Sequence, residues 1–450
     1  MKYLRGLCTL FFGVAVLLFF GLAYPHHLHY QEQYQLFLFD NTYVWDIVRH
    51  PGGVADLLGR FCTQFFLFAW VGALIIAVLL SLIQVLMLRL IKWGWLYGLT
   101  FLPSFLLWLF LLDENALMGG VWAVLLTLLV ISGCLLLPKG WLRRIAILVA
   151  IPILYWMALG GSHYYRYPTV IPYLLYGAWL SAIILPLIVH FCKVQGLWLK
   201  VQGSTFLLVA VVMGTLVWKN ANFKAEKVMQ YDFMARYQQW NRILATANAE
   251  KPNNQIGVTV QNLALAMHGM LADHLFDYNQ NGIAGLLPDV QSDATSPLPT
   301  AEAFYQLGMI YVAQRTVFEA QEAILDFQKS ARCYQRLAQT NLINGSYEVA
   351  RKYLMALQKT LFYREWANET LLLLGNEEAI AKHPEYGRLR QCAYDKDFYF
   401  SDHVTPEMLE SLYSHNTDNR LAFEYLKAYY MLTGDRESYT KLLQELSVKK

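Results

Sequence analysis

The sequence predicts an all-α protein in two parts. These are a bundle of about seven transmembrane helices in residues 1–218 and a solenoid of helical hairpins in residues 219–450. Of its 450 residues, 56% are hydrophobic and only 15% are charged, whereas soluble domains carry roughly a quarter charged residues. Residues 1–218 hold 12 Lys and Arg with 6 Asp and Glu, and the remainder holds 24 with 27. The first part is therefore expected in lipid and the second in water.

Seven apolar stretches without a central charge supply the predicted spans. They are residues 6–23, 61–88, 94–112, 117–137, 145–160, 170–191 and 203–218. The near absence of ionisable residues within them disfavours an ion channel or a proton-coupled pump, and Gln84 is expected to hydrogen-bond a neighbouring helix. The first stretch could instead be a cleaved signal peptide, although its long apolar run favours a retained anchor.

The Lys and Arg residues of the loops predict the orientation, because these residues concentrate on the cytoplasmic side. Alternate loops, counted from the N-terminus, carry nine of them, and the intervening loops carry three. The nine are Lys2, Arg5, Arg89, Lys92, Lys139, Arg143, Arg144, Lys193 and Lys200, and the three are Arg49, Arg60 and Arg166. We expect a membrane protein with a cytoplasmic N-terminus and a C-terminal domain on the opposite side of the membrane.

A spacing typical of helical hairpins recurs in the second part. Its first copy consists of Phe304, Leu307, Gly308, Tyr311 and Ala320, and its second includes Tyr334, Gly345, Tyr347 and Ala350. Gly and Ala let antiparallel helices approach closely, and aromatic residues are expected to fill the grooves between hairpins. This part resembles the tetratricopeptide-repeat family, with a spacing shorter than the family's usual period of about 34 residues. We expect about five or six hairpins.

Three further features of the sequence concern the cysteines, a loop and the expected partners. Cys333 and Cys392 could form a disulfide outside the cytoplasm, although buried thiols are the favoured interpretation. The Pro-rich stretch 281–300 predicts a surface loop between hairpins. There is no phosphate-binding glycine loop, no G-x-S-x-G, no H-E-x-x-H and no basic stripe, so nucleic acid is not expected as a partner.

The first external loop, residues 24–60, holds the candidate site residues. His26, His27 and His29 with Glu32 are residue types that bind metals, but their spacing is not that of a helical metal motif, so interfacial packing is favoured. Asp40 is expected to cap a helix because Asp-Asn-Thr precedes an amphipathic stretch. Asp46 and Arg49 are expected to form a solvated pair.

The plan of the chain resembles that of the polytopic lipid-linked glycosyltransferases, in which a span is followed by an external loop with an acidic residue. Some of them, the O-mannosyltransferases, also end in tetratricopeptide arrays. The resemblance implies a catalytic carboxylate at Asp40, with Asp46 and Glu32 in reserve, which would deprotonate an acceptor hydroxyl or hold a divalent metal. The sequence departs from that pattern because the loop is short, lacks an adjacent acidic pair and is followed by few spans.

The chain also resembles uncharacterised membrane proteins of Bacteroidota in PGGVADLLGRFCTQFF (51–66) and LINGSYEVARKYL (342–354). The resemblance implies a bacterial inner membrane, which with the orientation above places the C-terminal domain in the periplasm. We expect a protein that contacts membrane lipid and whose external repeat domain binds a partner protein or peptide in a scaffold or assembly role. The alternative is a lipid-linked glycosyltransferase that uses the first loop, and a cofactor, a divalent metal, is expected only in that case.

Overall fold

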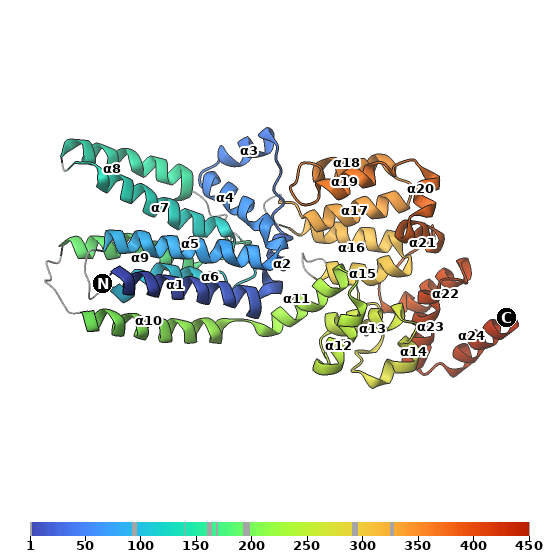
Figure 1. The fold of residues 1–450 in the computed structure, drawn as a ribbon. Coiled ribbons are helices and arrows are strands. Elements are labelled where there is room, and N and C mark those ends of the chain that lie inside the picture. The colour runs from blue at the N-terminus through green and yellow to red at the C-terminus, as the bar shows by residue number, and fades with distance from the viewer. Residues whose placement is uncertain are drawn as a thin grey trace. The chain divides into compact units, whose positions relative to one another are not determined.

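The computed structural model describes residues 2–91, 97–138, 140–159, 164–167, 170–191, 199–289, 296–324 and 328–449. Within these ranges every regular element is helical, and an isolated antiparallel bridge pairs Ala116 with Tyr165. The predicted all-α class is therefore confirmed. Lys92, Lys139 and Lys193, which contribute to the predicted orientation, lie outside the described residues. The chain divides into two compact units, Met1–Glu226 (unit 1) and Lys227–Lys450 (unit 2), whose elements are labelled in Figure 1.

Unit 1 contains long apolar helices and several shorter elements. They are α1 (Lys2–Leu18), η1 (Phe19–Ala23), α2 (Pro25–Glu32), α3 (Asn41–Val48), α4 (Gly53–Thr63), η2 (Gln64–Leu67), α5 (Ala69–Leu90), η3 (Tyr97–Phe101), α6 (Leu102–Phe110), α7 (Met118–Leu136), α8 (Trp141–Leu154), η4 (Tyr155–Leu159), α9 (Tyr173–Phe191) and α10 (Leu199–Asn220). α11 (Phe223–Arg236) begins in this unit and continues into unit 2.

Three helices in the described part of unit 1 are long and apolar enough to cross a membrane. They are Tyr3–Ala23, which joins α1 to η1, Ala69–Leu90 and Met118–Leu136. A fourth span is obtained if Ser204–Asn220 and Phe223–Arg236, bent by 56°, are counted together. The stretches 94–112 and 170–191 contain the shorter apolar helices Tyr97–Phe110 and Tyr173–Pro186. These lengths and compositions indicate membrane association.

The apolar stretch 61–88 is divided in the structure, whereas the sequence predicts one continuous span. α4 ends at Thr63, the short η2 follows, and Phe68 is extended with φ −113° and ψ 100° before α5 begins at Ala69. No Gly or Pro marks this break, so composition gives no sign of it.

The long helices of unit 1 pack side by side around an apolar core. α1 contacts α5, α5 contacts α7, α6 contacts α9, and α10 contacts η3 (Figure 1). The predicted hydrogen bond of Gln84 is confirmed, because Thr9 of α1 donates to its Oε1 over 2.8 Å and its Nε2 donates to Thr100 over 3.1 Å. Polar side chains thus join three segments within the apolar bundle.

Unit 2 is built from short helices in sequence order. Beyond the end of α11 they are α12 (Trp240–Glu250), α13 (Gln255–Met267), α14 (Leu271–His274), η5 (Leu275–Asp277), η6 (Gly282–Gly285), α15 (Pro297–Leu307), α16 (Ile310–Glu322), α17 (Ala331–Ile343), α18 (Tyr347–Leu357), α19 (Arg364–Leu371), α20 (Glu377–Lys382), α21 (Pro384–Cys392), η7 (Asp402–Val404), α22 (Thr405–His415), α23 (Arg420–Thr433) and α24 (Arg436–Lys449).

Consecutive helices of unit 2 pack against one another as hairpins. α15 contacts α16, α16 contacts α17, and α17 contacts α18, and the pairs α12 with α13 and α22 with α23 also pack together (Figure 1). The turn between α15 and α16 is only two residues long, and Gly308 ends α15 with φ +96°, a conformation that favours glycine.

The loop predicted at 281–300 is shorter in the structure. α15 already begins at Pro297, so Pro297 and Pro299 lie in its first turn. Proline lacks a backbone N–H, and in the first turn of a helix this group would have no partner within the helix. Residues 290–295 of the predicted loop lie outside the described part of the chain. The prolines were therefore a sign of where a helix starts.

Candidate functional site

The three acidic residues proposed for the first loop occupy different environments. Asp40 caps α3, and its carboxylate accepts hydrogen bonds from the backbone N–H groups of Thr42 and Tyr43 at 3.0 and 3.3 Å. Asp46 pairs with Arg49 at 3.3 Å, and both side chains are more than 60% exposed. Glu32 is buried at the end of α2. Asp40 and Asp46 thus have the cap and pair contacts that local sequence suggests.

Of the first-loop histidines, His26 and His27 are buried in unit 1, whereas His29 is partly exposed. His26 and His27 donate their backbone N–H groups to the carboxylate of Glu226 at 2.7 and 2.8 Å. Burial lowers the pKa of His27 to about 4, so its imidazole is neutral at physiological pH, and Nε2–H donates to the carbonyl of Leu111 over 3.0 Å. Among the described residues, no three His, Cys, Asp or Glu side chains are arranged to hold a metal ion.

α4 of the first loop carries a buried ion pair. Asp56 and Arg60 are one helical turn apart, their side chains are 11% and 13% exposed, and Arg60 Nη2 lies 2.8 Å from Asp56 Oδ2. Burial by itself would lower the pKa of Arg60, but the negative charge of the Asp56 carboxylate has the larger effect, so the pKa of Arg60 is raised. The i, i+4 spacing was visible in the sequence, but the burial was not.

Arg166 lies buried among aromatic and amide side chains of unit 1. Its guanidinium is 3.8 Å from the ring centroid of Tyr34, and Nη1 donates to Tyr30 over 3.4 Å. Arg166 and Tyr34 border a cavity of about 10 Å³ together with Glu114. That volume suits roughly one water molecule and is too small for a sugar or a phosphate group.

The residues of the predicted repeat lie mostly in the core of unit 2. Phe304, Leu307, Ala320 and Ala350 are fully buried, Tyr334 is partly buried against the ring of Tyr353, Gly345 ends a turn with φ +77°, and Tyr347 is partly buried. Tyr311 differs, because it is 43% exposed. Its backbone N–H is instead bonded to the carboxylate of Asp397 over 2.9 Å. Cys333 and Cys392 are both buried free thiols.

Unit 2 contains a hollow of about 310 Å³ that the sequence did not suggest. Its lining is Val228, Asn254, Gln255, Ile256, Thr259, Pro288, Asp289, Ser296, Pro299 and Thr300. Thr259 is only 2% exposed, and its hydroxyl has no hydrogen-bond partner among the described residues. An unpartnered buried hydroxyl is costly, and a ligand that enters the hollow could satisfy it.

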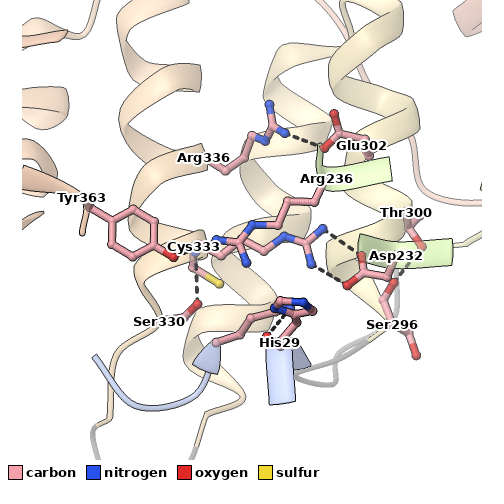
Figure 2. A network of polar contacts seen from close by, with 12 residues as sticks. His29, Asp232, Arg236, Ser296, Thr300, Glu302, Ser330, Cys333, Arg336 and Tyr363 are labelled. Atoms are coloured by element: carbon pink, nitrogen blue, oxygen red, sulfur yellow. Dashed lines mark hydrogen bonds and ion pairs between the residues drawn. The ribbon is translucent and has the colours of Figure 1, made fainter. Parts of the chain in front are cut away.

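Two buried ion pairs hold the helices that wall this hollow. Asp232 lies one turn after Val228 on α11, and its carboxylate accepts hydrogen bonds from both Nη atoms of Arg332 on α17 at 2.6 and 2.8 Å. Glu302 on α15 pairs with Arg336, also on α17 (Figure 2). α17 is therefore fixed to both α11 and α15, and a wall held in this way is preorganised for binding.

The comparison with protein families decides where the chain belongs. The family of unknown function DUF6057 matches it over residues 1–163 and 157–450. The chain belongs to this family. No curated protein and no solved structure matches it.

In this DUF6057 protein, the hollow and its ion pairs are the features that sequence reasoning missed. Asp232 and Arg332 are a hundred residues apart, and Thr259 lies within a helix of otherwise ordinary composition. No spacing rule joins such residues, because their contact depends on how the hairpins stack. The amide and hydroxyl groups of the lining could hydrogen-bond a peptide backbone, and Val228 and Ile256 add apolar surface for a side chain.

Proposed function

We propose that unit 2 binds an extended segment of a partner protein in the hollow beside Thr259, in a scaffold or assembly role. The observation that carries this proposal is the hollow of about 310 Å³, one of whose lining residues, Thr259, has a buried hydroxyl without a hydrogen-bond partner among the described residues. That volume is at the lower end of ligand sites, and it suits a few residues of a chain and not a whole domain surface.

The lining of the hollow indicates the chemistry of the segment. Asp289 is the one ionisable residue among the described lining residues, and the other polar groups are amides and hydroxyls. A backbone in extended form offers both donors and acceptors to such groups, whereas an acidic side chain would be repelled by Asp289. The segment is therefore neutral or basic.

The rest of the proposal concerns the position of unit 2. We place the chain in a bacterial inner membrane with seven spans, a cytoplasmic N-terminus and unit 2 in the periplasm as a tetratricopeptide-like solenoid. The excess of Lys and Arg in alternate loops supports this orientation, and the three helices of membrane length support the membrane location. The packed hairpins α15–α16 and α17–α18 support the repeat architecture.

The glycosyltransferase alternative receives no comparable support from the first loop. Asp40 accepts hydrogen bonds as a helix cap, Asp46 is a solvated ion pair, and the cavity beside Glu114 is about 10 Å³. A sugar donor needs a larger site with carboxylates that converge on it.

Site-specific photo-crosslinking in living cells tests the proposed binding. A photoreactive amino acid replaces Gln255, an exposed residue of the lining, in the full chain. The control carries it at Leu372, which is 79% exposed in the turn that follows α19. We expect an adduct with a discrete polypeptide from position 255 that the change Thr259→Val weakens. Equal adducts from both positions, or adducts from neither, would contradict the proposal.

A reporter fused after Lys450 tests the proposed orientation separately. Alkaline phosphatase, which is active only outside the cytoplasm, should be active there, and a fluorescent protein that requires the cytoplasm should be dark. The reverse pattern would place unit 2 in the cytoplasm and would remove periplasmic proteins from the possible partners.

A further inference from the structure

A groove of about 710 Å³ runs along unit 1 between α1 and α5. Both helices are long and apolar enough to span a membrane, so the groove lies where lipid chains are found. Small residues form part of its lining, namely Gly6 and Gly13 of α1 with Ala77 and Ser81 of α5. Larger apolar side chains such as Leu10, 63% exposed, form its rim.

The groove is polar at one end. Arg5 lines it there, and its guanidinium lies 5.8 Å from the ring centroid of Tyr97. The hydroxyl of Tyr97 donates to the backbone carbonyl of Arg5 over 3.1 Å, so this turn of α1 is held in place. The other end, at Leu17 and Leu74, is apolar. The groove is therefore apolar along most of its length and has a cationic side chain at one end.

The dimensions favour a single hydrocarbon chain over a second helix. The 12 steps between Arg5 and Leu17 rise about 18 Å, and a helix about 10 Å wide along that length would fill about 1,400 Å³. The groove offers about half of this volume. One acyl chain is narrower than a helix and flexible enough to follow an irregular lining of Gly, Ala and Ser.

We propose that this groove binds one acyl chain of an anionic phospholipid, whose phosphate contacts Arg5. A guanidinium donates paired hydrogen bonds to phosphate oxygens, and an anionic headgroup adds charge that a zwitterionic lipid lacks. With a cytoplasmic N-terminus, Arg5 faces the leaflet whose anionic lipids attract basic residues near the membrane surface.

The glycines of unit 1 provide a matched pair of variants. A Cβ at Gly6 meets no atom within 4 Å, so Gly6→Leu should add bulk at a lining residue of the groove without a backbone clash. A Cβ at Gly133 of α7 also meets no atom within 4 Å, and Gly133 does not line the groove, so Gly133→Leu adds the same bulk elsewhere. Arg5→Gln removes the cation and leaves the apolar part of the groove unchanged.

Native mass spectrometry of the full chain in detergent measures the binding. The protein is titrated with dioleoylphosphatidylglycerol and, separately, with dioleoylphosphatidylethanolamine, and thermal melting confirms that each variant is folded. We expect the first phosphatidylglycerol to bind at least about fivefold more tightly than phosphatidylethanolamine. Gly6→Leu should weaken that binding about tenfold, Gly133→Leu should leave it unchanged, and Arg5→Gln should abolish the preference between the lipids.

Three results would overturn the proposal. They are equal lipid binding by Gly6→Leu and Gly133→Leu, a preference for phosphatidylglycerol that survives Arg5→Gln, and a dimer that Gly6→Leu dissociates. The last result would assign the groove to a second copy of the chain.

Discussion

Replacing one residue of the Asp232–Arg332 pair should lower the stability of unit 2 strongly. Replacing both residues should restore the stability. The side chains are 11% and 7% exposed, and two hydrogen bonds of 2.6 and 2.8 Å join them. Asp232→Leu leaves a guanidinium that cannot lose its proton and lies buried without its carboxylate. Arg332→Met leaves the Asp232 carboxylate buried without its guanidinium, so it should destabilise unit 2 as well.

The size of the effect follows from the burial of the pair. Removal of one partner of a buried ion pair costs about 3–5 kcal/mol, whereas replacement of both by apolar residues of similar volume is often neutral or stabilising. For a unit of this length, 1 kcal/mol moves the melting temperature by about 2–4 °C. Asp232→Leu should therefore lower the melting temperature of unit 2 by about 6–20 °C. The double variant should return to within a few degrees of the parent protein.

Cys333 provides a probe for the unfolding of unit 2 in the full chain. Its thiol is fully buried next to Arg332 in α17, and burial raises its pKa to about 11, so it should react with a maleimide only when the unit opens. Detergent-solubilised protein is heated in steps, pulsed with the reagent and analysed by mass spectrometry of the peptide that contains Cys333.

Two results would refute this reasoning. The first is a shift below about 2 °C for Asp232→Leu, because a buried charge cannot lose its partner at so small a cost. The second is a double variant as unstable as the two single changes summed, which would mean that the residues do not act as a pair.

Further predictions concern two glycines and two carboxylates. Gly308→Ala should destabilise the chain by more than Gly345→Ala. Both glycines have positive φ, but only at Gly308 would the new Cβ clash, since it would lie 2.9 Å from the carbonyl oxygen of Cys392. The strained backbone alone costs about 1–2 kcal/mol, so denaturation should show at least that loss at Gly345 and a larger one at Gly308. Burial raises the pKa of Asp397 to about 7, so this group favours the folded state below its unfolded pKa near 4, and that contribution is lost as pH rises through 7. Asp397→Asn should flatten this decline in urea unfolding between pH 5 and 8, and an unchanged slope would contradict the assignment. Asp40→Ala should lower the protection of α3 from hydrogen exchange by about 1 kcal/mol, whereas Asp40→Asn should keep most of that protection. If Asp40 were catalytic instead, both variants would lose surface-glycan synthesis.

Local features of the chain were the most predictable from sequence. Apolar runs indicated helices of membrane length, and the cap at Asp40 and the pair of Asp46 with Arg49 required only neighbouring residues. Gln84 was also predictable, because an amide inside an apolar bundle must find a partner on another helix.

Boundaries and distant contacts were less predictable. The break at Phe68 carries no Gly or Pro, and Pro297 belongs to a helix start that resembles a loop in composition. The carboxylate of Glu226 reaches the backbone of His26 across two hundred residues, and only the fold brings them together. The hollow at Thr259 arises in the same way, from helices whose stacking no local pattern specifies.

The affinity of the crosslinked segment for the full chain tests the central claim most directly. A synthetic peptide of that segment is titrated by fluorescence anisotropy against the parent protein and against two variants, Thr259→Ser and Thr259→Val. Serine keeps the hydroxyl and valine keeps the shape, so the peptide should bind Thr259→Ser nearly as tightly as the parent and Thr259→Val about five- to tenfold more weakly, as expected for one lost hydrogen bond. Equal affinity for all three proteins would show that the buried hydroxyl does not contact the ligand, and the binding site would have to be sought elsewhere on unit 2.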